Sequence, residues 1–176
     1  LAPYGEPKYK DLIYNNLIDV KDDGTFLLDQ KYFNYSTGLT MTNKNFSRLF
    51  GQEPRNSETE KLTQFHMDIA SSIQTVTEDI IIKLCRSIKE EYKISNLCLA
   101  GGVALNCVAN GKIQKDGKFE NLWIQPAAGD SGGALGAALC TQYLFKKQPR
   151  QLPQIMDRMN GAYLGPSYSQ KEIEQR

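Results

Sequence analysis

Two short apolar runs, each ending in a turn and followed by a helix, constrain the fold of this chain more than any other feature. Residues 96–100 (Asn-Leu-Cys-Leu-Ala) and 121–125 (Asn-Leu-Trp-Ile-Gln) have the length and composition of strands. Helices are predicted before, between and after them, which gives the order helix–strand–helix–strand–helix over residues 57–147. This alternation predicts an α/β fold in which parallel strands are joined by right-handed crossovers.

The helix expected before the first strand carries the clearest periodicity in the chain. Its apolar residues are spaced by 4, 4, 3, 4, 4 and 4 positions, which places them on one helical face. They are Phe65, Ile69, Ile73, Val76, Ile80, Leu84 and Ile88. Two further helices are expected over residues 103–114 and 134–145.

The segment over residues 1–55 is rich in turn signals and predicts a β-hairpin. Its strands are expected within 16–20 and 25–28, with Gly24 supplying the backbone freedom of the turn. The hairpin is interpreted as a surface decoration without chemistry. At the other end of the chain, Ser169 and Glu172 have the spacing of a capping box and predict the start of a short helix.

Composition excludes several classes of function. The 21 Lys and Arg residues nearly balance the 20 Asp and Glu residues, so no strong field favours a nucleic acid or a membrane surface. The longest nearly unbroken apolar run, 97–105, is far shorter than the roughly 20 residues that span a bilayer. Four cysteines without a CxxC pair, together with a single histidine, predict buried, reduced thiols in the cytoplasm rather than a zinc site.

The first turn, Gly101-Gly102, is a candidate phosphate site. Ligands of parallel sheets lie beyond the carboxyl ends of the strands, and glycines there let a ligand approach the backbone. The N-terminus of the following helix offers free N–H groups to a phosphate. Asn106, expected one turn into that helix, could bind a ribose or a base. The alternative is that the glycines only permit tight packing of helix on strand.

The second turn, residues 125–134, is expected to open on the same edge of the sheet. Asp130 is the only carboxylate in either turn. It could cap the next helix, as Asp commonly does, or serve as an oxygen ligand of a metal that also holds phosphates. Ser131 could cap equally well. The small residues that follow leave one helix face nearly bare, open to another helix or to a nucleotide.

Other titratable residues of the long helix receive structural interpretations. His66 lies beside the apolar stripe without a nucleophile or second ligand nearby in sequence, which favours a surface or boundary position. Glu78 and Asp79 are expected on the solvated polar face.

Two long motifs resemble the signatures of the carbamoyltransferases of nodulation-factor and antibiotic biosynthesis. They are Leu-Ala-Gly-Gly-Val-Ala-Leu-Asn-Cys-Val-Ala-Asn-Gly-Lys at 99–112 and Pro-Ala-Ala-Gly-Asp-Ser-Gly-Gly-Ala-Leu-Gly-Ala-Ala at 126–138. The segments 1–5 (Leu-Ala-Pro-Tyr-Gly), 68–74 (Asp-Ile-Ala-Ser-Ser-Ile-Gln) and 163–166 (Tyr-Leu-Gly-Pro) are similar to further motifs of that family. The resemblance therefore covers essentially the whole chain.

The resemblance implies an actin-like ATPase (ASKHA, RNase H-like) fold with a β-hairpin insertion. It also implies an enzyme that passes a carbamoyl group from carbamoyladenylate, made from carbamoyl phosphate and ATP, to a substrate hydroxyl. Carried over by motif, Gly101, Gly102, Asn106 and Gly129 would bind the adenylate. Asp130 would be one ligand of a divalent metal, Fe²⁺ or else Mg²⁺.

The resemblance also sets expectations for the organisation of the protein. Residues 1–147 would be the later part of the actin-like domain, with a hairpin region at 1–55 and an αβαβα core at 57–147. Residues 148–176 would lead toward a C-terminal adenylate-forming domain. The family's paired histidine ligands and a further aspartate lie upstream of its Leu-Ala-Pro-Tyr-Gly motif, so this piece alone should be inactive and could self-associate through uncovered surfaces.

Neither the acceptor nor the general base is assigned by these residues. Two other functions stay open at this point: a phosphotransferase of the same fold, and a non-catalytic binding module. A paired-histidine motif upstream would favour carbamoyl transfer, and a phosphate loop in its place would favour a kinase.

Overall fold

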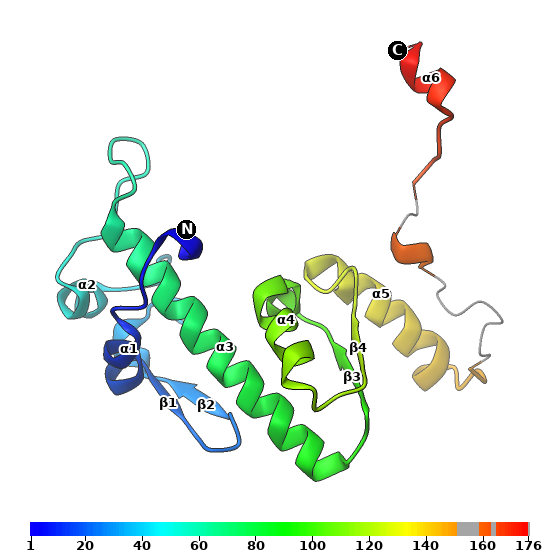
Figure 1. Ribbon diagram of the computed structural model, residues 1–176, viewed down its shortest axis with the longest axis horizontal. Coiled ribbons are helices and arrows are strands. Elements are labelled where there is room, and N and C mark those ends of the chain that lie inside the picture. The colour runs from blue at the N-terminus through cyan, green and yellow to red at the C-terminus, as the bar shows by residue number, and fades with distance from the viewer. Residues whose placement is uncertain (151–158, 163–164, 176) are drawn as a thin grey trace. The chain divides into compact units, whose positions relative to one another are not determined.

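The computed structural model describes residues 1–150, 159–162 and 165–175. Part of the predicted linker and the first half of the 163–166 motif lie outside the described residues. The chain divides into two compact units, the first comprising residues 1–97 and 107–122 and the second residues 98–106 and 123–176. The order helix–strand–helix–strand–helix predicted over 57–147 is confirmed, and the architecture is mixed α/β (Figure 1).

The first unit is built on α3 (Gln64–Tyr92), the long helix predicted from the apolar stripe. Val76 and Ile80 lie in the core, with 1% and 7% of their surface exposed. Ile73 and Ile88 of the same stripe are 48% and 41% exposed, so part of the predicted apolar face is uncovered among the described residues. α3 begins where Thr63 donates its backbone N–H to Nδ1 of His66 over 3.1 Å, which confirms the boundary position of this histidine.

The predicted hairpin is present and contributes to the core. β1 (Ile18–Val20) pairs antiparallel with β2 (Phe26–Leu28), with Ile18 opposite Leu28. Ile18 is buried with residues of α1 (Lys10–Asn16), α2 (Lys44–Phe50) and α3. Gly24 has φ +87°, and a Cβ there would lie 2.5 Å from the backbone nitrogen of Leu84. The hairpin is therefore packed onto α3, and its interpretation as mere surface decoration was wrong.

α4 (Cys107–Asp116) also packs along α3. Lys112 of α4 pairs with Glu78 of α3, whose carboxylate also accepts a 2.7 Å hydrogen bond from Gln74. Glu78 is only 5% exposed, which corrects its predicted place on a solvated face. Arg86 and Asp116 form a second ion pair between the same two helices.

β3 (Asn96–Leu99) and β4 (Asn121–Ile124) form the second sheet. Glu120 donates its N–H to the carbonyl of Ser95, and Gln125 donates to that of Leu99, at 2.9 and 3.0 Å. The pairing advances in the same direction along both strands, so the predicted parallel arrangement is confirmed.

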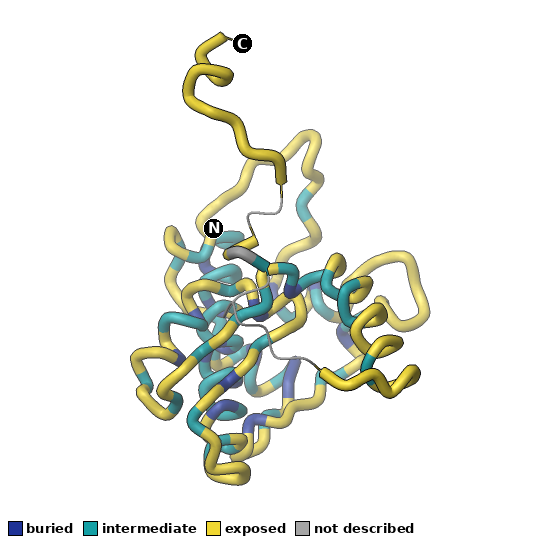
Figure 2. Tube along the Cα trace, turned by 90° about the vertical axis from the view of Figure 1, so that its right-hand side faces the viewer, coloured by how far each residue is buried: buried dark blue, intermediate teal, exposed yellow. Residues whose placement is uncertain are grey.

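The second unit contains a 3₁₀ turn (Gly102–Leu105), α5 (Asp130–Cys140) and a π-helical continuation (Thr141–Phe145). Farther on, α6 (Gln170–Glu174) starts at the predicted capping box of Ser169 and Glu172, and residues 165–175 are exposed throughout (Figure 2). No helix in the described part of the chain is both long and apolar enough to cross a membrane.

The cysteines differ from expectation. Only Cys85 is buried, whereas Cys98, Cys107 and Cys140 are exposed, and all four are free thiols. The prediction of four buried thiols failed because α5 and the outer faces of β3 and α4 have few neighbours among the described residues. Burial raises the pKa of the Cys85 thiol and keeps it protonated.

Candidate functional site

The two glycine-rich turns of the second unit are joined directly by their backbones. The N–H of Gly101 donates a 2.8 Å hydrogen bond to the carbonyl of Ala128. Gly101 adopts φ +97° and ψ 158°, a conformation that residues with a side chain rarely take. The prediction that both turns open on the same edge of the sheet is therefore confirmed, and the first glycine is required for the path of the chain.

A cavity of about 380 Å³ lies beside these turns. Gly101 and Gly129 line it, together with Trp123 of β4 and the glycines of α5. A Cβ at Gly101, Gly129 or Gly133 would meet no atom within 4 Å, so the absence of side chains leaves open space. Most of the lining is apolar, which suits a flat apolar group more than a phosphate.

Gly132 has a different role from the other glycines of this turn. A Cβ at this position would lie 2.1 Å from the carbonyl oxygen of Ala127. The N–H of Gly132 donates a 3.0 Å hydrogen bond to the carbonyl of Gly129. Gly132 therefore allows the second turn to close tightly on the first turn of α5.

Asn106 does not lie one turn into a helix, as the sequence predicted. The 3₁₀ turn ends at Leu105, and Asn106 is extended, with φ −72° and ψ 91°. Its N–H donates to the carbonyl of Val103 over 2.9 Å, and α4 begins at the next residue. The predicted helix over 103–114 is thus split at Asn106, which does not line the cavity beside the two turns.

Asp130 is the first residue of α5, and Gly129 occupies the N-cap position without a side-chain cap. The capping roles considered for Asp130 and Ser131 were therefore wrong. Within the described residues the exposed Asp130 carboxylate makes no hydrogen bond or ion pair, so its oxygens are available. A carboxylate in the first helical turn is also favoured by the helix dipole.

The described residues do not form a complete metal centre. They contain no cluster of three or more His, Cys, Asp or Glu side chains with suitable placement. Asp130 fits a metal only as a single carboxylate ligand, and the other ligands would have to come from outside the described residues.

Comparison with known proteins adds a family to this geometry. A family model described as Carbamoyltransferase N-terminus matches residues 1–139. The chain belongs to the carbamoyltransferase family. This confirms the resemblance seen in the motifs of the two glycine-rich turns.

Three relatives match this chain over almost its whole length. An uncharacterized protein, sll1178 of Synechocystis sp., is 59% identical over 99% of the chain. Nodulation protein NolNO of Sinorhizobium fredii is 33% identical over 99% of it, and nodulation protein NolO of Bradyrhizobium diazoefficiens is 32% identical over 98%. The chain spans only 28%, 23% and 28% of the length of these relatives.

The carbamoyltransferase motifs at 1–5 and 68–74 meet in the first unit. Asp68, 3% exposed, accepts hydrogen bonds from the N–H of Glu6 at 2.9 Å, Nζ of Lys8 at 2.9 Å and Nε2 of Gln64 at 2.7 Å. A Cβ at Gly5 would lie 2.0 Å from the carbonyl oxygen of Met67. These motifs therefore hold the N-terminal segment on α3, a role the sequence analysis missed. The signals available in the sequence were the two motifs themselves and the spacing of Asp68 and Ser72, four residues apart.

Proposed function

We propose that this chain is part of an enzyme that transfers a carbamoyl group from carbamoyladenylate, made from carbamoyl phosphate and ATP, to a substrate hydroxyl. The observation that supports this most is the hydrogen bond from Gly101 to Ala128, which joins two glycine-rich turns beside one cavity. Membership of the carbamoyltransferase family supplies the group that is transferred.

The adenylate is proposed to bind at the two turns. Gly101, Gly102 and Gly129 would let its phosphate approach the backbone, and the N-terminus of α5 would favour the negative charge. The apolar cavity with Trp123 would take the adenine, because a planar base gains from apolar contacts. Asn106 would bind a polar group of the nucleotide through its amide.

In the transfer step, the acceptor hydroxyl oxygen attacks the carbamoyl carbon. A new C–O bond forms, the bond from that carbon to the phosphate oxygen breaks, and AMP leaves with the bonding pair. The proton of the hydroxyl passes to a base that these residues do not assign. The backbone N–H groups of the turns and α5 would stabilise the charge that develops on the leaving phosphate.

Asp130 is proposed as the one metal ligand that this chain contributes. A phosphate at the N-terminus of α5 would lie near the Asp130 carboxylate, and two anions at one place repel each other unless a cation lies between them. A divalent ion, Fe²⁺ or Mg²⁺, would supply that charge.

The proposal extends to an actin-like fold and to a location in the cytoplasm. The parallel pair β3–β4 supports placing residues 1–147 within an actin-like domain. The free thiols and the use of ATP favour the cytoplasm.

The test uses the intact gene product with ATP, carbamoyl phosphate and a divalent metal. Mass spectrometry should detect carbamoyladenylate and pyrophosphate, and a hydroxyl acceptor should then gain one carbamoyl group with release of AMP. Asp130→Ala should lower the metal content measured by plasma mass spectrometry, whereas the neighbouring Ser131→Ala should not. Folded, metal-loaded protein that forms no carbamoyladenylate would refute the proposal, and phosphoryl transfer to the acceptor would indicate a kinase instead.

A further inference from the structure

The cavity beside the two glycine-rich turns contains a single amide side chain. The cavity lies wholly within the second unit, and no Lys, Arg, Asp or Glu is among the described residues that line it. Its one amide belongs to Gln125, which is half-buried and directly follows β4. The other polar side chains of the described lining, Trp123 and Cys98, offer only a ring N–H and a weakly polar thiol. Because a few polar groups fix the orientation of a ligand in an apolar cavity, Gln125 is placed to distinguish one flat, uncharged group from another.

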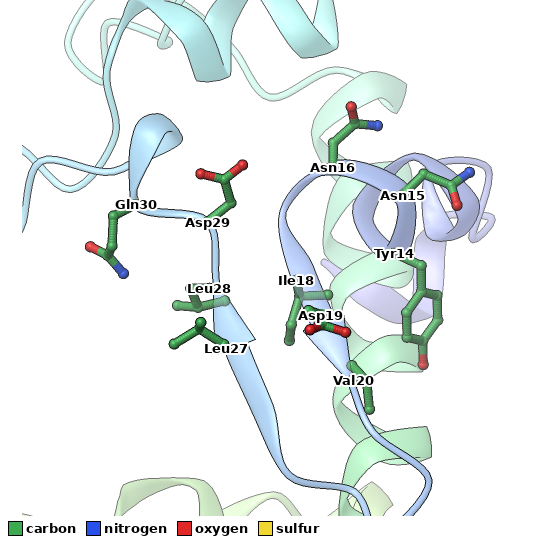
Figure 3. Close-up of a pocket in the computed structure, with 10 residues that line it drawn as sticks. All are labelled: Tyr14, Asn15, Asn16, Ile18, Asp19, Val20, Leu27, Leu28, Asp29 and Gln30. Atoms are coloured by element: carbon green, nitrogen blue, oxygen red, sulfur yellow. The ribbon is translucent and has the colours of Figure 1, made fainter.

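A larger hollow of about 690 Å³ on the hairpin differs from this cavity in its charges and its walls (Figure 3). Asp19 and Asp29 line it, and each is already paired with a lysine. Leu27 and Leu28 are consecutive residues of β2, so their side chains lie on opposite faces of the strand and do not form one apolar wall. A flat apolar ring is therefore better accommodated beside Trp123 than on the hairpin.

Gln125 and Trp123 lie on the same face of the β3–β4 sheet. They are two residues apart, and the N–H of Gln125 donates to the carbonyl of Leu99 at 3.0 Å, so the alternation of β4 continues as far as Gln125. Trp123 is 47% exposed, which leaves part of its indole ring open to the cavity. A planar ring stacked on Trp123 would therefore have an edge directed toward the Gln125 amide.

The amide of Gln125 is held in one orientation. Its Oε1 accepts a 3.2 Å hydrogen bond from the N–H of Ala127. Because an N–H can donate to the amide oxygen but not to the amide nitrogen, the amide cannot turn over without losing this bond. Nε2 makes no hydrogen bond within the described residues, and Oε1 keeps a second lone pair. The amide therefore offers one donor and one acceptor, side by side and in a fixed order.

Adenine and guanine present opposite groups to an amide of fixed orientation. Adenine carries an amino donor next to a ring nitrogen that accepts, so a glutamine amide can pair with both at once. Guanine carries a carbonyl acceptor at the position of that amino group. A guanine stacked in the same place would set its oxygen against the amide oxygen, and its buried polar groups would lack partners.

We propose that Gln125 selects adenine and disfavours guanine at this cavity. Oε1 accepts a hydrogen bond from the amino group of adenine, Nε2 donates to the neighbouring ring nitrogen, and Trp123 stacks on the face of the base. Gln125 is thus a specificity-determining residue of the nucleotide site. The presence of a nucleotide here rests on the proposed function, whereas the choice of base follows from Gln125.

Calorimetric titration of the intact gene product with AMP and with GMP tests the role of Gln125. AMP should bind roughly tenfold or more tightly than GMP, as expected for bidentate recognition of a base. Gln125→Glu keeps an oxygen for the N–H of Ala127 but replaces the donor by a second acceptor, so it should lower the ratio of the two affinities by roughly tenfold. Trp123→Ala should weaken both nucleotides by a similar factor and leave the ratio unchanged, because stacking tolerates any base.

Gln114→Glu is the matched control for the added charge. It changes an exposed glutamine of α4 that does not line the cavity, and it should leave both affinities unchanged. The proposal is overturned if the unaltered protein binds GMP as tightly as AMP, or if Gln125→Glu leaves the ratio unchanged. It is also overturned if Gln125→Glu alters only the preference for AMP over 2′-deoxyAMP, because Gln125 would then bind the ribose.

The binding ratio and the chemistry are separate readouts. Formation of carbamoyladenylate together with a ratio that does not respond to Gln125→Glu would overturn the role of Gln125 alone. A ratio that depends on Gln125, without formation of carbamoyladenylate, would overturn carbamoyl transfer alone. Binding at a nucleotide site elsewhere in the polypeptide would respond to neither Gln125→Glu nor Trp123→Ala, and a complete lack of response to both would also overturn the role of Gln125.

Discussion

Asp68 is a buried acid whose three partners come from two parts of the chain, the segment before α1 and the start of α3. Its two oxygens accept one backbone and two side-chain hydrogen bonds, and its neighbour one turn on, Ser72, accepts the N–H of Tyr9 at 3.0 Å. The segment before α1 is therefore held by side chains of α3 and not by a sheet or a disulfide. An acid of this kind is needed in its ionised form, because all its partners are donors.

Replacing Asp68 by Asn should destabilise the first unit. The amide keeps the size of the side chain but presents an NH₂ group where two oxygens now accept hydrogen bonds, so one buried donor loses its partner. Urea unfolding of the intact gene product should show a lower midpoint for Asp68→Asn. Asp11→Asn, at an exposed position of α1, should leave the midpoint unchanged. Equal midpoints for the two variants would contradict the role given to Asp68.

The same residue predicts a dependence of stability on pH. The hydrogen bonds from Glu6, Gln64 and Lys8 lower the pKa of Asp68 from 3.8 to about 2. Because the folded-state pKa lies below the unfolded value, the stabilisation is complete above pH 3.8 and is lost as the pH falls toward 2. The unfolding midpoint of the unaltered protein should fall more steeply over this window than that of Asp68→Asn. If the unfolding midpoints of the two proteins fall equally as the pH is lowered, groups other than Asp68 govern the loss of stability in acid.

At the scale of elements, local patterns predicted most of the fold. The apolar stripe of α3, the runs of β3 and β4, the hairpin turn and the capping box of α6 each depend on neighbours within a few residues, and each is present. The helix expected over 103–114 was confirmed from residue 107 onward and wrong before it. There Ala104 and Asn106 donate to Gly101 and Val103, three residues back, so the chain forms a 3₁₀ turn before α4.

Features that depend on distant partners were not predictable from sequence. Glu78 is polar and has the spacing of a solvated face, and only the packing of Lys112, 34 residues later, explains its burial. At the candidate site, the sequence correctly predicted that the two glycine-rich turns adjoin. It could not show that Gly129 takes the N-cap and leaves Asp130 unpaired, because capping depends on the path of the backbone into α5.

The ion pairs between α3 and α4 predict a contrast between two similar substitutions. Lys112→Met leaves the buried Glu78 carboxylate with only Gln74 as a partner, and should cost about 1–2 kcal/mol, reduced by the exposure of the lysine. Arg86→Met removes the cation of the second pair, whose carboxylate is more exposed, and should cost less than Lys112→Met. Adding Glu78→Gln to Lys112→Met should restore part of the loss. Chemical denaturation measures all four proteins, and equal losses for the two single variants would contradict the contrast.

Two adjacent glycines of α5 offer a second matched comparison. Alanine at Gly132 would place its Cβ against the Ala127 carbonyl at 2.1 Å, so the turn must shift and the protein should lose stability. Alanine at Gly133 meets open space and should gain up to about 1 kcal/mol from the better helix propensity of alanine. Thermal unfolding of the two variants should therefore move in opposite directions. A higher unfolding temperature for Gly132→Ala would show that the second turn has room for a Cβ beside the Ala127 carbonyl.

At the scale of the whole molecule, the two units differ in how much they bury. The first unit holds a hydrophobic core cluster that includes Val76, which is 1% exposed, and Ser72 of the same helix is 0% exposed. In the second unit α5 has no buried residue, and Leu139, Leu144 and Phe145 are 46%, 73% and 84% exposed. Exposed apolar residues of this kind favour contact with another surface. Since the relatives are about four times as long as this chain, such a surface can come from the same polypeptide or from a second copy.

Hydrogen exchange can distinguish these sources of cover. In the chain of residues 1–176, amides around Ser72 and Val76 should exchange most slowly, and those of 165–175 within the earliest times, because local stability follows burial. The amides of α5 should exchange faster than the centre of α3 in this chain and become protected in the intact gene product. Protection of α5 that instead rises with the concentration of the 1–176 chain would show that a second copy covers it. Slow exchange of α5 in the dilute chain would contradict its exposed position, because a helix without buried residues has little to resist local opening.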